Sequence, residues 1–194
     1  MILSNKRYLW GLDISLRNTG LAIYDLEEEK FVHVDSFLTE KIYATKQYKG
    51  YNLHALKLKK ITEWIKEMYL KYPPEVVAME MIISQKKKTA SGFAFAQHND
   101  IIALSKVHGV IQCMLWKIPQ EIYSPTEIKK YVVKGNATKD LVQDVLKLRF
   151  PYIKFLDDDQ SDAVAVAVTY LVKNGLLEWR KPLIKDVMKN KKGE

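Results

Sequence analysis

The sequence holds a single cysteine, Cys113, among its 194 residues. One cysteine excludes a disulfide framework within the chain, which is typical of proteins from a reducing, intracellular compartment. Cys113 lies in the apolar run VIQCMLW. This setting predicts a buried and unreactive thiol rather than a nucleophile.

Long apolar runs are also missing. No stretch approaches the roughly 18 apolar residues of a membrane-spanning helix, and the opening MILSNKRYLW is too short and too polar for a signal peptide. Internal repeats and low-complexity linkers are absent as well. We therefore expect a soluble, cytoplasmic protein without a membrane partner, with one domain over residues 1–175 and a basic tail over residues 176–194.

Positive charge is in excess. The chain has 31 Lys and Arg against 23 Asp and Glu, a formal net charge of +8. Such a balance favours polyanionic partners, with nucleic acid first among them. Hydrophobic residues make up 47% of the sequence, which is enough for a full core and excludes the fibrous and disordered classes.

The hydrophobic pattern changes its period along the chain. Short runs over 8–13, 21–24 and 31–37 predict an antiparallel meander. After them we expect a helix over 53–68 that is ended by Pro73-Pro74, an apolar strand over 75–83 and a polar basic loop over 84–92. A helix over 101–115 and a strand at 121–123 follow. Three helices complete the order: one begun by a Ser124–Glu127 capping box with Pro125, one over 138–150 after Gly135, and one over 161–173 closed by Gly175. This order predicts an α/β fold, a mixed central sheet with helices on both faces.

Isolated acids interrupt the apolar segments. Asp13 ends the first strand, and Glu80 lies inside the run VVAMEMII. Charged side chains are seldom buried unless they are paired or bind a metal ion. In the segment LDDDQSDAVAVA, Asp159 and Asp162 are spaced so that a helix places both on one face, and the spacing of Asp158 and Asp162 allows the same.

A cluster of such carboxylates would repel itself and partly protonate unless cations lay within it. Oxygen ligands without a His or Cys pattern suit Mg²⁺ or Mn²⁺. Two such ions about 4 Å apart can drive phosphodiester hydrolysis. Taken singly, the acids also suit ordinary structural roles: residues 157–159 can cap a helix, and Asp13 can be a turn residue. The joint pattern therefore carries the prediction.

A run of lysines follows directly on the strand that holds Glu80. Lys86, Lys87 and Lys88 would lie beside the predicted carboxylate site. A lysine triplet in an arbitrary protein is usually a solvated loop. Next to a site for phosphodiester chemistry, we expect these lysines to contact nucleic acid phosphates.

Three blocks of the chain, WGLDISLRNTGLAI, VVAMEMII and DQSDAVAVAVTYL, resemble the RuvC-type Holliday junction resolvases of the ribonuclease H-like superfamily. Their order and spacing match that family, as does the segment YSPTEIKKYVVKGNATK. The similarity extends over residues 8–173. It implies a ribonuclease H-like fold and a structure-selective DNA endonuclease that resolves four-way junctions by paired, symmetric nicks.

The resemblance also implies roles for individual residues. Asp13, Glu80, Asp159 and Asp162 would hold two Mg²⁺ ions, for which Mn²⁺ would substitute, and the products would be a 5′-phosphate and a 3′-hydroxyl. Lys139 matches a catalytic basic residue near the scissile phosphate. The motif selects Asp159 over Asp158, a choice that helical spacing leaves open.

The remaining implied features concern DNA and assembly. Arg17 stays in register with the family motif, and Lys129 matches another basic residue. The family acts as a symmetric homodimer, and a helix over residues 100–116 would match its dimer-forming helix. Two departures stand out: Ile14-Ser15 replaces the usual Pro-Gly, and Ile83 replaces an aromatic that stacks on junction bases. Phe93, or Phe95, is the candidate to take over that stacking.

Other functions remain open at this level. A related ribonuclease H-like nuclease acting on RNA, hybrid or flap substrates would use the same acids. A sugar-kinase or actin-like ATPase shares a phosphate-binding turn like DISLRNTG, although it usually needs two such domains. A non-catalytic junction-binding module would require a lost acid, whereas all four are present in this sequence.

Overall fold

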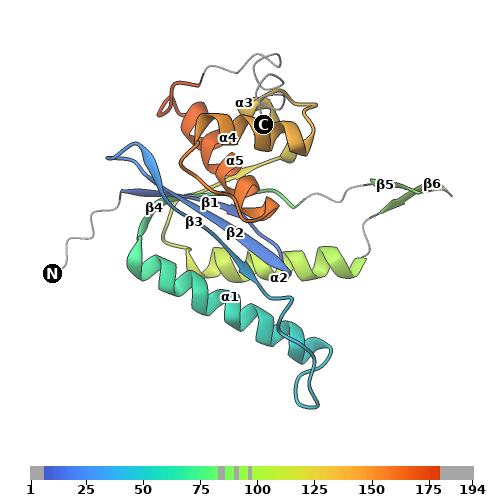
Figure 1. The fold of residues 1–194 in the computed structure, drawn as a ribbon. Coiled ribbons are helices and arrows are strands. Elements are labelled where there is room, and N and C mark those ends of the chain that lie inside the picture. Colours follow the sequence, from blue (N-terminus) through green and yellow to red (C-terminus); the bar gives the residue numbers. More distant parts are fainter. Residues whose placement is uncertain (1–6, 83–85, 90–91, 96–97, 180–194) are drawn as a thin grey trace.

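The computed structural model describes residues 7–82, 86–89, 92–95 and 98–179, with side-chain surroundings for residues 7–82 and 101–179. A five-stranded sheet in the order β3-β2-β1-β4-β7 forms its centre (Figure 1). The strands are β1 Tyr8–Asp13, β2 Asn18–Asp25, β3 Lys30–Leu38, β4 Pro74–Glu80 and β7 Gln120–Tyr123. The pairs β1–β2 and β2–β3 are antiparallel, whereas β4 runs parallel to β1 and to β7.

Helices cover both faces of this sheet (Figure 1). The helices α1 (Tyr51–Lys71) and α2 (His98–Met114) lie on one face. The helices α3 (Pro125–Val132), α4 (Lys139–Arg149) and α5 (Asp158–Lys173) lie on the other. The mixed sheet with helices on both faces therefore confirms the predicted fold class.

Alternation along β1 divides the core into two layers. Trp10 and Leu12 pack with the buried residues of α1 and α2, whereas Leu9 packs with those of α5. This follows from the two-residue period of a strand, which sends successive side chains to opposite faces. Helix α5 is buried along almost its whole length because α3 and α4 cover its outer side.

Most predicted elements lie where their patterns indicate, with shifted ends. The second strand begins at Asn18 rather than residue 21, and the last helix begins at Asp158 rather than residue 161. Side-chain bonds explain the earlier helix start, since Asp157 accepts a hydrogen bond from the Gln160 amide at 2.9 Å.

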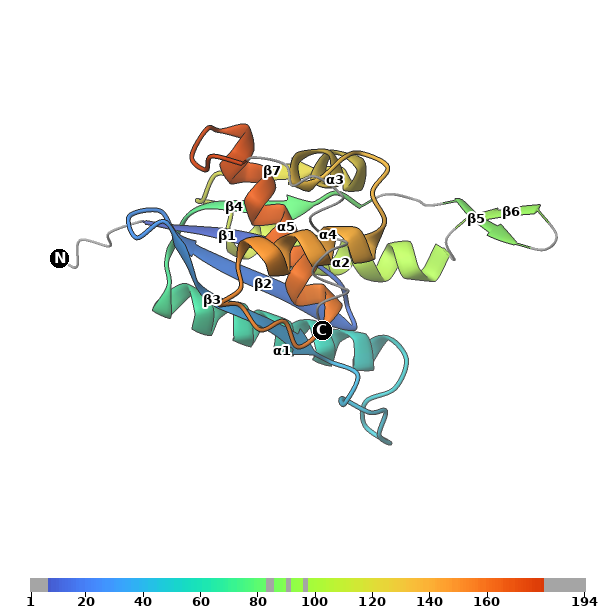
Figure 2. The same ribbon diagram turned by 45° about the horizontal axis from the view of Figure 1, so that its top comes forward.

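The loop predicted over residues 84–92 is wrong in its central part. The strand β5 (Lys86–Thr89) pairs antiparallel with β6 (Gly92–Phe95). Composition alone favoured a loop, because a lysine run carries no hydrophobic alternation. This hairpin lies apart from the five-stranded sheet (Figure 2).

Cys113 is exposed, so the prediction of a buried thiol is wrong. Helix α2 buries Val107 and Ile111 against the sheet layer. Cys113 lies two residues beyond Ile111, about 200° around the helix, and therefore faces away from that layer. The apolar run around it had suggested burial on all sides.

The predicted boundary at residue 175 stays a prediction. Leu177 and Trp179 lie beyond it and still pack on the core, and the Trp179 ring donates to the Val132 carbonyl at 2.9 Å. Within the part of the chain that the structure describes, no helix has both the length and the apolar character needed to cross a membrane.

Candidate active site

Asp13 and Glu80 lie at one edge of the sheet. Asp13 is the last residue of β1 and Glu80 the last of β4, and the two strands are parallel neighbours with Leu12 opposite Met79. Because parallel strands end at a common edge, the two carboxylates are brought together. Pairing therefore joins acids that are 67 positions apart in the sequence.

Two glycines allow α5 to approach this edge. A Cβ at Gly20 would overlap the carbonyl of Asp159, and one at Gly11 would overlap the carbonyl of Ala163. Only a residue without a side chain fits between strand and helix at these points. The N-terminal part of α5, with Asp159 and Asp162, is thereby held against β1 and the start of β2.

Hydrogen bonds from β2 and β3 fix the start of α5. The Asn18 amide donates to Asp159 at 2.7 Å and to Asp157 at 3.0 Å. The Ser36 hydroxyl also donates to Asp157, at 2.5 Å. Sequence reasoning missed Asn18 and Ser36, because RNTG carries the signal of a turn and the bonds span more than 120 positions. Neither residue could have been found from local pattern.

Asp158 and Asp159 have different surroundings. Asp158 is largely exposed and accepts a hydrogen bond from the Gln143 amide at 2.7 Å. Asp159, by contrast, is among the charges that raise the pKa of Asp13. The charge of Asp159 therefore couples it to Asp13, whereas Asp158 pairs with Gln143 and Lys139.

The four acids at this edge have raised pKa values and are therefore harder to ionise than free carboxyl groups. Burial, followed by the charges of Asp162, Glu80 and Asp159, raises the pKa of Asp13 well above its usual value. Burial and the charge of Asp162 raise the pKa of Glu80 to about 7. Burial likewise raises the pKa of Asp159 and Asp162. Burial is the largest cause for each acid, repulsion between neighbouring carboxylates adds to it, and a bound cation would relieve that repulsion.

Among the described residues, Lys139 is the basic side chain that pairs with these acids. Its ammonium lies 2.7 Å from Asp162 and 3.4 Å from Asp158. Burial would lower the pKa of Lys139, but the hydrogen bond and the charge of Asp162 raise it to about 12. Thr138 caps the helix that begins at Lys139 and so aims this side chain at the acids. The positive charge of Lys129, on α3, lowers the pKa of Glu80 and so opposes the effects of burial and of Asp162.

The four acids fit a hard divalent cation by the chemistry of their oxygen donors. As the side chains stand, no three Asp, Glu, His or Cys groups among the described residues converge closely enough to hold an ion. The reason is visible in the contacts: Asn18 engages Asp159, and Lys139 engages Asp162. A metal ion would therefore have to take Asp162 from Lys139.

The other predicted contacts lie outside the cluster of acids, and those on the hairpin of β5 and β6 lie apart from the sheet (Figure 2). Arg17 is exposed in the connection between β1 and β2. Lys86, Lys87 and Lys88 lie on β5 and Phe93 on β6, with Lys88 paired to Phe93. The side-chain surroundings of these four residues, and the whole of Ile83, lie outside the described part of the chain.

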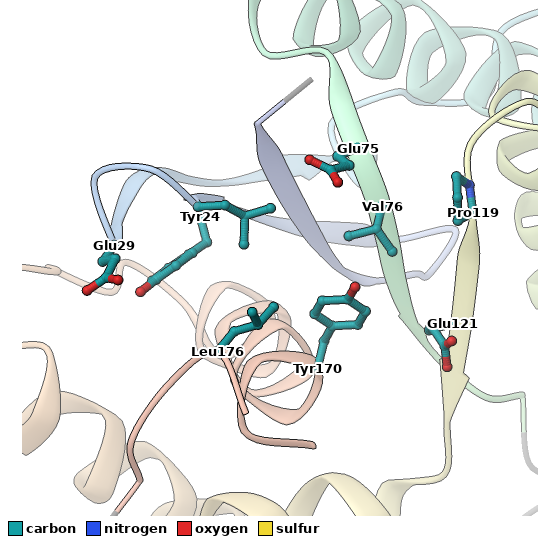
Figure 3. A pocket seen from close by; sticks show the side chains of 9 residues that line it. Tyr24, Glu29, Glu75, Val76, Pro119, Glu121, Tyr170 and Leu176 are labelled. Carbon is teal, nitrogen blue, oxygen red and sulfur yellow. The ribbon is translucent and has the colours of Figure 1, made fainter. Parts of the chain in front are cut away.

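A hollow of about 460 Å³ lies at the opposite end of the sheet (Figure 3). It is bordered by Glu29, Glu75 and Glu121 and by the rings of Tyr24 and Tyr170. Tyr24 stands near the end of β2, Glu29 in the turn after it, Glu75 and Glu121 near the starts of β4 and β7, and Tyr170 near the end of α5, all away from Asp13 and Glu80. The hollow is therefore separate from the acidic edge.

Comparison with known proteins gives a consistent result. The family model "Crossover junction endodeoxyribonuclease RuvC" matches residues 9–170. The protein of that name from Brachyspira hyodysenteriae is 31% identical over 166 residues, covering 84% of this chain and 93% of its own length. The one from Hydrogenovibrio crunogenus is 30% identical, covering 85% and 87%.

Solved structures agree in fold. Thermus thermophilus RuvC in complex with a Holliday junction substrate superposes with a TM-score of 0.67 at 15% identity, covering 88% of this chain and 96% of that one. The yeast mitochondrial Holliday junction resolvase Ydc2 gives a TM-score of 0.58 at 13% identity, with 88% and 80% coverage. Both likenesses therefore support the ribonuclease H-like fold of this chain.

Proposed function

Because the chain belongs to the RuvC family of crossover junction endodeoxyribonucleases, we propose that it resolves four-way DNA junctions by Mg²⁺-dependent hydrolysis, nicking two strands symmetrically. One observation carries the proposal most directly. Four acids from three distant segments lie near one sheet edge, and each has a raised pKa. Such self-repelling carboxylates suit a site that is completed by divalent cations.

The residues of the edge divide the work. Asp13, Glu80, Asp159 and Asp162 would hold two Mg²⁺ ions, with Mn²⁺ as a substitute. When bound, these ions would supply an activated water and stabilise the leaving oxygen. Asn18 keeps Asp159 oriented through its 2.7 Å hydrogen bond. Lys139, once released from Asp162, would place its charge beside the scissile phosphate, and Lys129 would add positive charge near Glu80.

Further DNA contacts would come from basic residues outside the cluster of acids. Arg17, Lys86, Lys87 and Lys88 would bind phosphates, each contact adding to the salt dependence of binding. Phe93 would stack on bases near the crossover, in the place that Ile83 cannot fill. These roles concern one partner, branched DNA.

The second partner is another copy of this chain. Helix α2 presents an outward stripe that includes Gly109 and Cys113, and Trp116 just beyond the helix is 71% exposed. A Cβ added at Gly109 would meet no atom within 4 Å, so this side of the helix is open. We propose that two such helices pack together in a homodimer, which would set two active sites against the two strands to be cut.

A labelled synthetic four-way junction tests the proposal, incubated with Mg²⁺ or with EDTA beside a linear duplex, a flap and an RNA–DNA hybrid. We expect paired, symmetric nicks in the junction alone, and only with Mg²⁺. Cleavage of the flap or the hybrid instead would keep the metal chemistry and contradict junction resolution. Tight junction binding without any cleavage would contradict the enzymatic proposal.

A further inference from the structure

A basic groove of about 810 Å³ opens between the N-terminal halves of α1 and α2. Its charged and aromatic lining consists of Arg17, Tyr51, His54, Lys57 and Lys106. Among the described residues, those that line it include no acid. Arg17, Lys57 and Lys106 also have no acidic partner within 4.0 Å among the described residues, unlike Lys59 and Lys60, which pair with Glu63.

This groove adjoins the acidic edge. Its lining begins at Ser15, two residues after Asp13, and continues through Arg17 to α1. The Arg17 carbonyl accepts a hydrogen bond from the Thr39 amide at 2.8 Å, which ties this connection to the end of β3. Its lining residues place the groove next to the acids on the α1–α2 side of the sheet. Helix α5 covers the other side (Figure 1).

Helix α1 adds to the positive potential of the groove. It starts at Tyr51, and its first turn contains no acid. The positive end of a 21-residue helix thus faces the groove without an acidic side chain of its own to offset it. The basic side chains and the N-terminal end of the helix therefore both favour binding of an anion in the groove.

Tyr51 gives the groove a fixed wall. The side chain is 82% exposed, and the Lys106 ammonium lies 5.0 Å from the centre of its ring. A cation over an aromatic face is held in place by the ring's charge distribution. The arrangement positions Lys106 across the groove from Lys57 without neutralising it, which suits a contact with a phosphate.

From these observations we infer that the basic groove binds the phosphodiester backbone of one arm of the DNA substrate, on the side of the active edge opposite α5. The inference rests on the proposed function, since it treats the acidic edge as the point of cleavage. The arm would leave the scissile phosphate along Arg17 and cross between Lys57 and Lys106. Its phosphates would replace counterions there, so these lysines should strengthen binding and leave the chemical step alone.

The test measures junction binding in EDTA by fluorescence anisotropy over a series of KCl concentrations. The double variant Lys57→Ala/Lys106→Ala should bind about tenfold more weakly or worse at low salt. The slope of log K against log [KCl] should fall by about 2, close to one unit per lost phosphate contact. At saturating junction with Mg²⁺, its cleavage rate should stay within about twofold of wild type.

The matched control is Lys66→Ala/Lys71→Ala, which removes two exposed lysines from the far part of α1. It should leave the slope unchanged. Tyr51→Phe should keep wild-type binding, whereas Tyr51→Ala should weaken it through Lys106. Thermal melting and light scattering establish that each variant is folded and assembled as wild type.

The outcomes separate this inference from the proposed function. If the wild-type protein cleaves junctions but the double variant keeps the wild-type slope, the groove proposal is overturned and junction resolution still stands. A reduced slope in a protein that binds but does not cleave the junction would support the groove and contradict the proposed function. Equal loss in the groove variant and in the control would show general electrostatic attraction only, and would overturn the groove.

Discussion

At the residue scale, burying the carboxylates of Asp13 and Glu80 costs folding free energy, and the sheet itself does not require these acids. Both end buried strands, and both have pKa values raised by burial and by neighbouring acids. Asp13→Asn should reduce junction cleavage by at least about a thousandfold while junction binding changes little, because it removes a metal ligand and not a phosphate contact. Rates from single-turnover gels and affinities from anisotropy check this. Undiminished cleavage by Asp13→Asn would remove the carboxylate from the mechanism.

Glu80 predicts a pH dependence of stability. Its folded pKa of about 7 lies above its ordinary value of 4.5, so the fold favours the protonated form. Its contribution is therefore fully present below pH 4.5 and is lost as the pH rises through 7. At pH 8 without metal, Glu80→Gln should unfold with a free energy about 2 kcal/mol higher than wild type, screening by solvent included.

Urea denaturation in EDTA at pH 5 and pH 8 measures this difference. The gain of Glu80→Gln over wild type should be small at pH 5 and largest at pH 8. Added Mg²⁺ should stabilise wild type at pH 8 more than the variant, because the ion relieves the repulsion that Gln has already removed. A gain that is equal at both pH values would contradict the assigned ionisation of Glu80.

Lys139 is placed to act on the reaction more than on binding. Its ammonium lies 2.7 Å from Asp162, inside the acidic edge. Lys139→Ala should slow cleavage by about 10- to 100-fold and weaken junction binding by less than threefold. Lys130→Ala, which removes an exposed lysine from α3, is the matched control and should change neither cleavage nor binding. Loss of binding with an unchanged cleavage rate would overturn the catalytic role of Lys139.

At this scale the sequence was informative wherever chemistry conflicted with local environment. An acid that ends or interrupts an apolar strand is improbable by packing alone, and this singled out Asp13 and Glu80. Asn18 has no such conflict, since an amide in a turn is ordinary. Its importance lies in bonds to Asp157 and Asp159 that exist only after β2 and α5 are packed together.

At the scale of elements, the contact of α5 with β1 and β2 determines where two of the four acids lie. Gly20→Ala should push the first turn of α5 away from the sheet, because an added Cβ would overlap the Asp159 carbonyl. We expect a loss of about 2–4 kcal/mol in unfolding free energy and a loss of most cleavage. Gly135→Ala is the control, since its Cβ would meet Thr126 at an ordinary 3.5 Å. Similar stability losses in both variants would contradict the close approach of α5 as the cause.

The elements themselves were largely predictable, and the exceptions have physical causes. The three-strand meander, the βαβ order and the cap at Ser124 follow from local pattern. The hairpin of β5 and β6 could not be predicted, because a run of lysines carries no alternation. The exposure of Cys113 could not be predicted either, since an apolar helix does not reveal which side meets the sheet.

At the scale of the whole molecule, the proposed homodimer makes a separate prediction. Gly109→Arg places a large charged side chain on the open side of α2. It should shift the protein from dimer to monomer in light scattering and lower the number of paired nicks, with folding intact. Leu70→Glu is the control, because Leu70 is 75% exposed on α1 and lies outside the proposed interface. A dimeric Gly109→Arg protein would contradict the α2 interface.

A plasmid that extrudes a cruciform offers the most direct measurement of the central claim, that the acidic edges of two copies cut a four-way junction in concert. Two nicks made within one bound complex convert the supercoiled circle directly to linear DNA, whereas separate nicks leave open circles. With Mg²⁺ we predict linear product from the wild-type protein and none from Asp13→Asn. Open circles alone, or linear product from Asp13→Asn, would contradict concerted cleavage by the acidic edges.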